Sequence, residues 1–281
     1  TACVITEGMW VLADYASHLT PGLLLFGLWF ALTPTTLPAM RILILLAAFV
    51  LMRDAMTPLG MWALGSEVQI AFSANAFVLA MLGWLSVLLI MLLARISPDL
   101  WRLIRWTLGH PGIGLACGLL VGCLIGVPLR IYQGIDASAI HGYWVWLPGM
   151  VVLAFGANAL EEVLFRGFLQ GYLEQHVTLL RAALISGVAF AACHAFLALS
   201  VTQLGWPVLL FTLLEGLACA LVRMRYGVLP AAVAHGTAIL LIAVPYKAYP
   251  ELGRENAAGL KNKVVIDAGN AVKARDGAVY D

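Results

Sequence analysis

Apolar residues form long runs in this sequence, and short polar segments separate them. A helix needs about 20 apolar residues to cross the hydrocarbon core of a bilayer. Runs of this kind lie near residues 9–32, 37–52, 69–94 and 112–132 in the first half of the chain, and near 143–172, 178–200, 207–224 and 228–246 in the second. The pattern therefore predicts an all-α, polytopic membrane helix bundle with about eight transmembrane helices.

The first run is the weakest of the eight, because Asp14, His18 and Pro21 interrupt it. Seven spans is accordingly the alternative count. Composition supports the membrane class: 62% of the 281 residues are hydrophobic and 11% are charged, whereas a soluble domain carries about 25% charged residues. The net charge of +1 gives no electrostatic reason to expect nucleic acid as a partner.

The polar segments divide the chain into three regions. Residues 1–142 hold the N-terminal transmembrane helices, and a segment near 98–107 with two Trp and two Arg predicts a short helix on the membrane interface. Residues 143–247 form a second group of four helices. Residues 248–281 are polar and rich in Ala, Gly and Lys, which predicts an extramembrane tail.

The arginines between the apolar runs indicate an orientation. In an eight-helix chain, alternate loops on one side carry seven of them: Arg41, Arg95, Arg102, Arg105, Arg181, Arg223 and Arg225. The opposite short loops carry Arg53 and Arg130. Arg53 is predicted to form a local ion pair with Asp54 at a helix end. The positive-inside rule places the first set in the cytoplasm and both termini outside, although the basic tail favours the reverse.

Ionisable residues interrupt the run near 143–172. Such a residue at bilayer depth costs about 2.5–3.5 kcal/mol on insertion scales, so it marks a functional site by default. Glu162 and Arg166 are four positions apart, which predicts an ion pair on one helical face. Glu161 is rotated by about 100° and stays available for chemistry. Asn158 lies one turn earlier on the same side.

Two later runs each contain a histidine. Phe190 precedes His194 by four positions, which predicts that its ring packs over the imidazole, and His235 lies in the last run. A lone histidine in an apolar helix is more often a hydrogen-bonded core residue than a catalyst. Three helices that each offer one titratable group nevertheless favour a single site, because a carboxylate and two imidazoles can deprotonate water and stabilise an oxyanion.

One known family carries the same motifs in the same order: Glu161-Glu162-x-x-x-Arg166, Phe190-x-x-x-His194 and His235. Over roughly residues 148–245 the chain resembles this family, the CAAX prenyl protease and bacteriocin-processing (CPBP, or Abi) proteins, which are glutamic-type intramembrane endopeptidases. The resemblance implies that Glu161 is the general base and that His194 assists it.

The remaining motif positions receive supporting roles from the same resemblance. Glu162 and Arg166 would orient the site, and His235 would polarise the scissile carbonyl. The family usually places Asn or Asp four residues after the last histidine, whereas this chain has Ile239, which cannot donate a hydrogen bond. Asn158 from the other helix, or His235 alone, would then have to polarise the carbonyl, which affects efficiency rather than reaction class.

The resemblance implies an intramembrane endopeptidase that uses glutamate-activated water on a membrane-associated protein or peptide within the lipid bilayer. Processing of C-terminal sorting signals and maturation of bacteriocins or other peptides are tasks of such proteins, and the implied location is a prokaryotic inner (plasma) membrane. Two alternatives stay open. A non-proteolytic scaffold or immunity protein is favoured by Ile239, and an ion-coupled carrier would use the same acids and histidines as a proton relay.

No cofactor is expected. A Glu with two His is a ligand set that zinc accepts, but the His-Glu-x-x-His motif is absent from the sequence, so a required metal is not predicted. One further carboxylate, Glu215, lies in the run near 207–224. It is interpreted as structural, pairing with a histidine or with Arg223, or facing a water-filled cavity.

Overall fold

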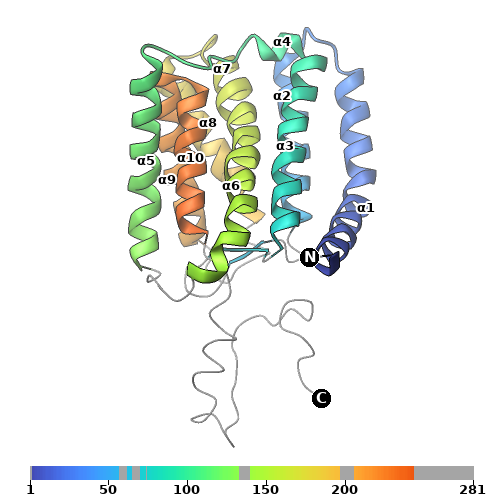
Figure 1. The fold of residues 1–281 in the computed structure, drawn as a ribbon. Helices are drawn as coiled ribbons and strands as arrows, with labels where there is room; N and C mark the ends of the chain where they lie inside the picture. The colour runs from blue at the N-terminus through green and yellow to red at the C-terminus, as the bar shows by residue number, and fades with distance from the viewer. Residues whose placement is uncertain are drawn as a thin grey trace, which may run out of the picture.

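The structure is a computed structural model that describes residues 2–56, 62–64, 70–73, 75–132, 140–196 and 206–243. Its long helices lie side by side in a bundle (Figure 1): α1 (Ala2–Leu32), α2 (Pro38–Asp54), α3 (Ala76–Ile96), α5 (Pro111–Tyr132), α6 (Ile140–Glu162), α8 (Leu179–Cys193), α9 (Trp206–Tyr226) and α10 (Val228–Ile242). The short helices are α4 (Pro98–Trp101) and α7 (Gln170–Leu173). The prediction of an all-α, polytopic helix bundle is confirmed, while the count of eight transmembrane helices stays a prediction.

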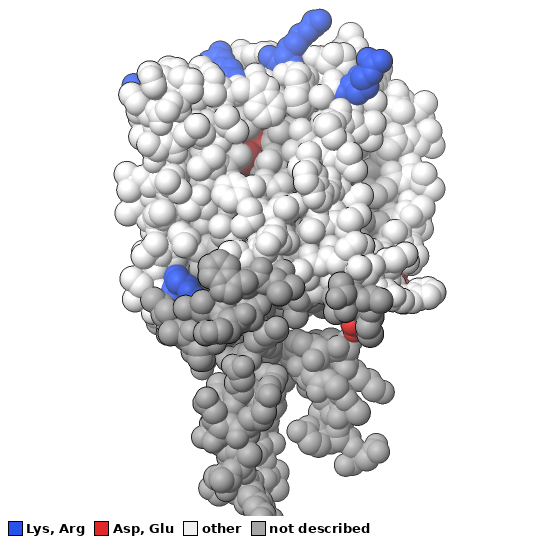
Figure 2. Space-filling view, in the orientation of Figure 1, with Lys and Arg blue, Asp and Glu red and all other residues white. Residues whose placement is uncertain are grey.

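Among the described residues, five helices are long and apolar enough to cross a membrane: α1, α3, α5, α9 and the continuous segment from Trp146 to Leu173. The apolar helices α8 and α10 are shorter. Figure 2 shows that the visible side of the bundle is a wide band with almost no charged side chains. Basic side chains lie along the upper edge of this band, which we call the basic rim. These features are those of an integral membrane protein.

The alternate loops to which the sequence assigns seven arginines lie at one end of the bundle. The α1–α2 connection, α4, α7 and the α9–α10 connection lie at the upper end in Figure 1, and the N-terminus lies at the lower end. The basic rim in Figure 2 is at the same upper end. The structure thus confirms the grouping of these loops, while the assignment of that end to the cytoplasm stays a prediction.

Two predicted helix boundaries were wrong. The run near 69–94 starts in a hairpin, where β1 (Trp62–Leu64) pairs antiparallel with β2 (Ile70–Phe72). Helix α3 begins only at Ala76, because the Asn75 side chain accepts hydrogen bonds from the backbone N–H groups of Phe77 and Val78 at 3.1 and 3.3 Å. The segment near 98–107 is helical only over Pro98–Trp101.

The residues after α4 form a strap across the junction of α9 and α10. The carbonyls of Arg105 and Trp106 accept hydrogen bonds from the N–H groups of Val228 and Leu229, both at 2.9 Å. These tertiary bonds take the place of a longer interfacial helix. The predicted tail at 248–281 lies outside the described residues.

Small residues allow the closest helix contacts. In α5, glycines recur every fourth position on the face that packs against α10, at Gly114, Gly118, Gly122 and Gly126. A Cβ at Gly118 would overlap the carbonyl oxygen of Pro230, and one at Gly122 would lie 2.5 Å from the carbonyl oxygen of Ala234. Such stripes let transmembrane backbones approach closely, so α5 supports the helix that carries His235.

Candidate active site

The predicted carboxylate pair lies where α6 changes its winding. Glu161 and Glu162 end the α-helical part, and a π-helical segment, η2 (Val163–Leu169), follows directly. Segments of this kind are rare and are frequent at functional sites. The Nη1 atom of Arg166 lies 3.2 Å from Oε1 of Glu162, and its Nη2 donates to the carbonyl of Gly216 in α9 at 2.8 Å. The predicted Glu162–Arg166 pair is confirmed, and both side chains are fully buried.

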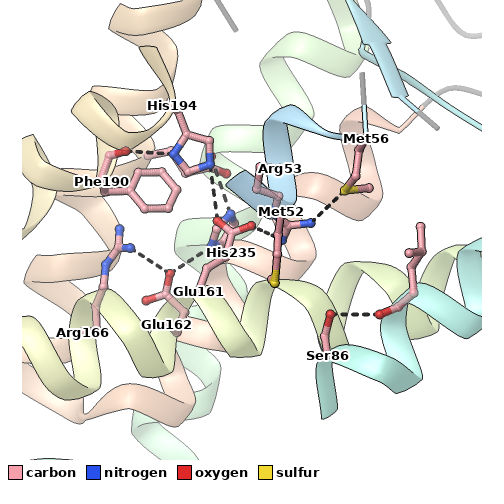
Figure 3. Close-up of polar contacts among 12 residues, drawn as sticks. Met52, Arg53, Met56, Ser86, Glu161, Glu162, Arg166, Phe190, His194 and His235 are labelled. Atoms are coloured by element: carbon pink, nitrogen blue, oxygen red, sulfur yellow. Dashed lines mark hydrogen bonds and ion pairs between the residues drawn. The ribbon is translucent and has the colours of Figure 1, made fainter. Parts of the chain in front are cut away.

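Glu161 points away from that pair, as predicted, and meets two other helices (Figure 3). Its Oε1 accepts a hydrogen bond from Nη2 of Arg53, which comes from the last turn of α2. Its Oε2 lies 3.6 Å from Nε2 of His194. We call Arg53, Glu161 and His194 the outer triad, because the side chains of Arg53 and His194 remain 16% and 11% exposed.

The hydrogen bonds of His194 define its tautomer. The residue caps the C-terminal end of α8, and its Nδ1 lies 2.8 Å from the carbonyl oxygen of Phe190. A carbonyl only accepts, so Nδ1 carries the hydrogen and Nε2 of the neutral ring presents a lone pair toward Glu161. The Phe190 ring packs over the imidazole with centroids 4.3 Å apart, which confirms the predicted contact. Phe49 of α2 packs against the imidazole at 5.4 Å.

His235 contacts the other carboxylate. Its Nδ1 lies 2.9 Å from Oε1 of Glu162, and its Nε2 lies 3.8 Å from Oε2 of Glu215 in α9. We call Glu162, Arg166, His235 and Glu215 the inner network; their side chains are at most 3% exposed. The structure thus gathers the predicted residues into two adjoining groups rather than into one triad of Glu161 with two histidines.

The predicted Arg53–Asp54 ion pair was wrong, whereas one of the alternatives predicted for Glu215 is found. Arg53 does not form a local pair with Asp54, because its guanidinium reaches across the bundle to Glu161. Arg223 pairs with Glu174 near the upper end of α9, and of the partners considered for Glu215 a histidine, His235, is the one found. The sequence signal for Arg53 is a cation at the end of an apolar run, but its partner depends on how the helices assemble.

The remaining candidates flank the two groups. Asn158 is 7% exposed, and its Nδ2 has no hydrogen-bond partner among the described residues. Ile239 packs against an apolar cluster that includes Ala154 and Ala157 of α6. Its side chain therefore contributes packing and no hydrogen bond at this depth.

One group of residues has the composition of a metal site. Glu162, Cys219 and His235 offer ligand atoms within 4.8 Å of one another. Arg166 is already paired with Glu162 there, so a guanidinium supplies the positive charge that a metal would bring. The expectation that no metal is required stays a prediction.

The fold and the two groups define a class of protein: an integral membrane helix bundle with buried carboxylates, guanidinium groups and imidazoles. A comparison with protein families narrows it, since residues 142–241 match the family of type II CAAX prenyl endopeptidases described as Rce1-like. No curated protein and no solved structure matches the chain. The family match confirms the resemblance found in the sequence. At the level of the family, it indicates a membrane endopeptidase.

The matched residues include every member of the inner network, together with Glu161 and His194. Arg53 lies outside them, in the N-terminal helices. The site as the structure assembles it is therefore larger than the segment that the family comparison covers.

Proposed function

We propose that the protein is a glutamic-type intramembrane endopeptidase in which Glu161 activates water to hydrolyse a peptide bond of a membrane-associated protein or peptide. The observation that carries this proposal is the pair of facing acceptors, Oε2 of Glu161 and Nε2 of His194, 3.6 Å apart. They lie within an otherwise apolar bundle, where an isolated charge would be costly.

These two atoms are placed to hold one water molecule. A water in contact with both donates one hydrogen to Glu161 and the other to His194, so that an oxygen lone pair is free for attack. Glu161 takes the proton as the water oxygen bonds to the carbonyl carbon. When the C–N bond breaks, the same proton passes to the leaving amine, and no acyl-enzyme forms.

The inner network is proposed to hold the site together. Arg166 joins η2 to α9, and His235 joins α10 to Glu162 in α6. The Nδ1–H of His235 donates to Glu162, so Nε2 carries a hydrogen for a substrate carbonyl only when the ring is doubly protonated. Asn158, whose amide nitrogen has no partner among the described residues, is a second candidate for that contact.

The substrate class follows from the site and from the family. The carboxylates lie at bilayer depth, so the scissile bond must reach them from a membrane-anchored or lipid-modified chain. The family description supports a CAAX-type processing step. Within that class, we propose C-terminal sorting signals or precursor peptides in a prokaryotic inner membrane as the substrates, on the resemblance described above.

The proposal is tested by comparing wild-type protein with Glu161→Gln and His194→Ala in the host cell. Mass spectrometry of membrane and secreted proteins is expected to find protein termini that occur in cells with the wild-type protein and are missing in cells with either variant. The amount of the protein itself should be the same in all three. Glu174→Gln is the matched control, since Glu174 is also a buried, ion-paired carboxylate but lies away from the outer triad. Termini that persist in both variants would overturn the peptidase proposal and favour the scaffold.

The arrangement of the acids also bears on the carrier alternative. A proton relay requires acids spaced along a path through the membrane. Here Glu161 with His194, and Glu162 with His235 and Glu215, form two adjoining groups that meet at neighbouring residues of α6. Two groups placed next to each other in this way support hydrolysis at one depth rather than transport along a path.

A further inference from the structure

The proposed hydrolysis requires a positive group that the inner network does not readily supply. Attack on a carbonyl moves negative charge onto its oxygen, and donors placed there usually give the largest part of the catalysis. Ile239 has no donor, and both ring nitrogens of His235 face carboxylates, at 2.9 and 3.8 Å. Asn158 offers only a neutral amide donor, so a positive charge beside this oxygen has to come from the outer triad.

We propose that Arg53 is a catalytic residue that binds the oxyanion during this reaction; the inference rests on the proposed function. Arg53 is the cation paired with Glu161, and it keeps partial exposure, whereas Arg166 is fully buried. The N-terminal helices then supply a reacting-site residue that lies outside the family match.

Within the described part of the chain, the guanidinium of Arg53 has N–H groups that no strong acceptor uses. It carries five N–H groups in a planar fork. Among the described residues, Nη2 bonds Glu161, while Nη1 has the Met56 thioether at 3.7 Å, a weak acceptor. The Phe49 ring lies 5.5 Å from the guanidinium carbon and supports its plane. A substrate carbonyl oxygen beside Glu161 can replace the Met56 sulfur as the acceptor for Nη1. The hydrogen bond between Nη2 and Glu161 then stays intact.

The charge balance of the step favours the same atom. Before attack, the negative charge next to Arg53 is on Glu161. As the water oxygen bonds to carbon, its proton goes to Glu161, and the negative charge appears on the former carbonyl oxygen. Arg53 thus loses its first anionic partner when the second one forms beside it. Collapse breaks the C–N bond, transfers the proton to nitrogen and restores the Arg53–Glu161 pair.

The test uses full-length protein in liposomes with the substrate whose termini depend on Glu161. Arg53→Gln is expected to lower kcat by about 10²–10³-fold, with KM changed less than about threefold because ground-state contacts remain. A phosphinic peptide of the same sequence, a mimic of the tetrahedral anion, should bind weaker by the same factor as kcat falls. Arg53→Lys, which keeps the charge without the fork, should fall between.

Arg41→Gln is the matched control, because Arg41 is in the same helix and forms a partly buried ion pair with Asp99 far from the outer triad. Activity per folded molecule should be unchanged in this variant. Equal losses in Arg41→Gln, or unchanged phosphinic-peptide binding in Arg53→Gln, would overturn the assignment. If Arg53→Gln does not fold, Arg53→Lys is used in its place. In that variant, too, kcat and the affinity for the phosphinic peptide should fall by the same factor. Loss of activity in Glu161→Gln but not in the Arg53 variants would reject this inference alone, whereas an active Glu161→Gln would reject the proposed function itself.

Discussion

Arg53 and Glu161 are separated by 108 positions in the chain and are joined by a hydrogen-bonded ion pair inside the bundle. The first residue lies in the last turn of α2, and the second lies in the last turn of α6. The predicted boundary between an N-terminal helical region and a C-terminal active region therefore separates two halves of one site. Variants should be designed with both halves in view.

His194 is expected to act through its ring nitrogen rather than through packing. His194→Phe keeps an aromatic ring between Phe49 and Phe190 but removes Nε2, the second acceptor for water. We expect a loss of kcat of about 10²–10⁴-fold, because without Nε2 the water is no longer oriented for proton transfer to Glu161, with little change in the unfolding temperature. Steady-state cleavage and thermal unfolding in detergent measure the two effects. His176→Phe, an exposed histidine that contacts Tyr172, controls for the substitution, and near-normal cleavage by His194→Phe would contradict the role.

The Glu162–Arg166 pair is expected to contribute mainly to stability. Replacing one partner, as in Arg166→Met, removes the guanidinium charge from a carboxylate at zero exposure and leaves it only the hydrogen bond to His235. The free energy of unfolding should fall by about 3–5 kcal/mol. Denaturant titration of purified protein measures it. The double variant Glu162→Gln, Arg166→Met should regain part of the loss, and a double variant as unstable as the sum of the singles would show that the pair is not coupled.

Close packing of α5 on α10 makes a further prediction. Gly118→Val places side-chain atoms against the backbone of Pro230, so the two helices must separate. Overpacking of this kind costs about 1–3 kcal/mol, and the displaced α10 should weaken cleavage because it carries His235. Gly27→Ala is the control, since a Cβ at Gly27 meets nothing within 4 Å. Thermal unfolding measures the stability of both variants, and Gly118→Val should unfold at the lower temperature. Equal unfolding temperatures would contradict the close packing of α5 on α10.

The α9–α10 junction depends on one glycine in a left-handed conformation. Gly227 has φ of 101°, and a Cβ there would lie 2.6 Å from the carbonyl oxygen of Trp106 in the strap. Gly227→Ala should therefore lower the free energy of unfolding by about 1–3 kcal/mol. Gly109, with φ of 68° and open space around it, should tolerate Asn. Proteolysis at the junction and unfolding temperatures test the contrast, and a stable Gly227→Ala protein would refute it.

The contacts that could be predicted from the sequence are local ones. Glu162 with Arg166 and Phe190 with His194 each follow from a spacing of four residues in a helix. The eight apolar runs were likewise sufficient for the fold class. Helix starts were less predictable, because Asn75 ends an extended segment that is itself apolar.

The pairings between helices could not be derived in this way. His235 contacts Glu162 rather than Glu161, and Arg53 pairs with Glu161 rather than with its neighbour Asp54. Both contacts depend on the relative rotation of packed helices, which the sequence pattern does not specify. The strap from Arg105 is equally non-local, since its hydrogen bonds lead to Val228. Periodicity specifies which face of a helix is polar, but not which helix that face meets.

The glycine stripe of α5 has a consequence for dissection of the protein. A fragment limited to residues 142–241 would leave the α5-facing side of α10 bare and Glu161 without its cation. Such a fragment should be inactive on its own, and activity should return when it is co-expressed with residues 1–141. The enzyme is in this sense a two-part assembly encoded in one chain, in which each part completes the other.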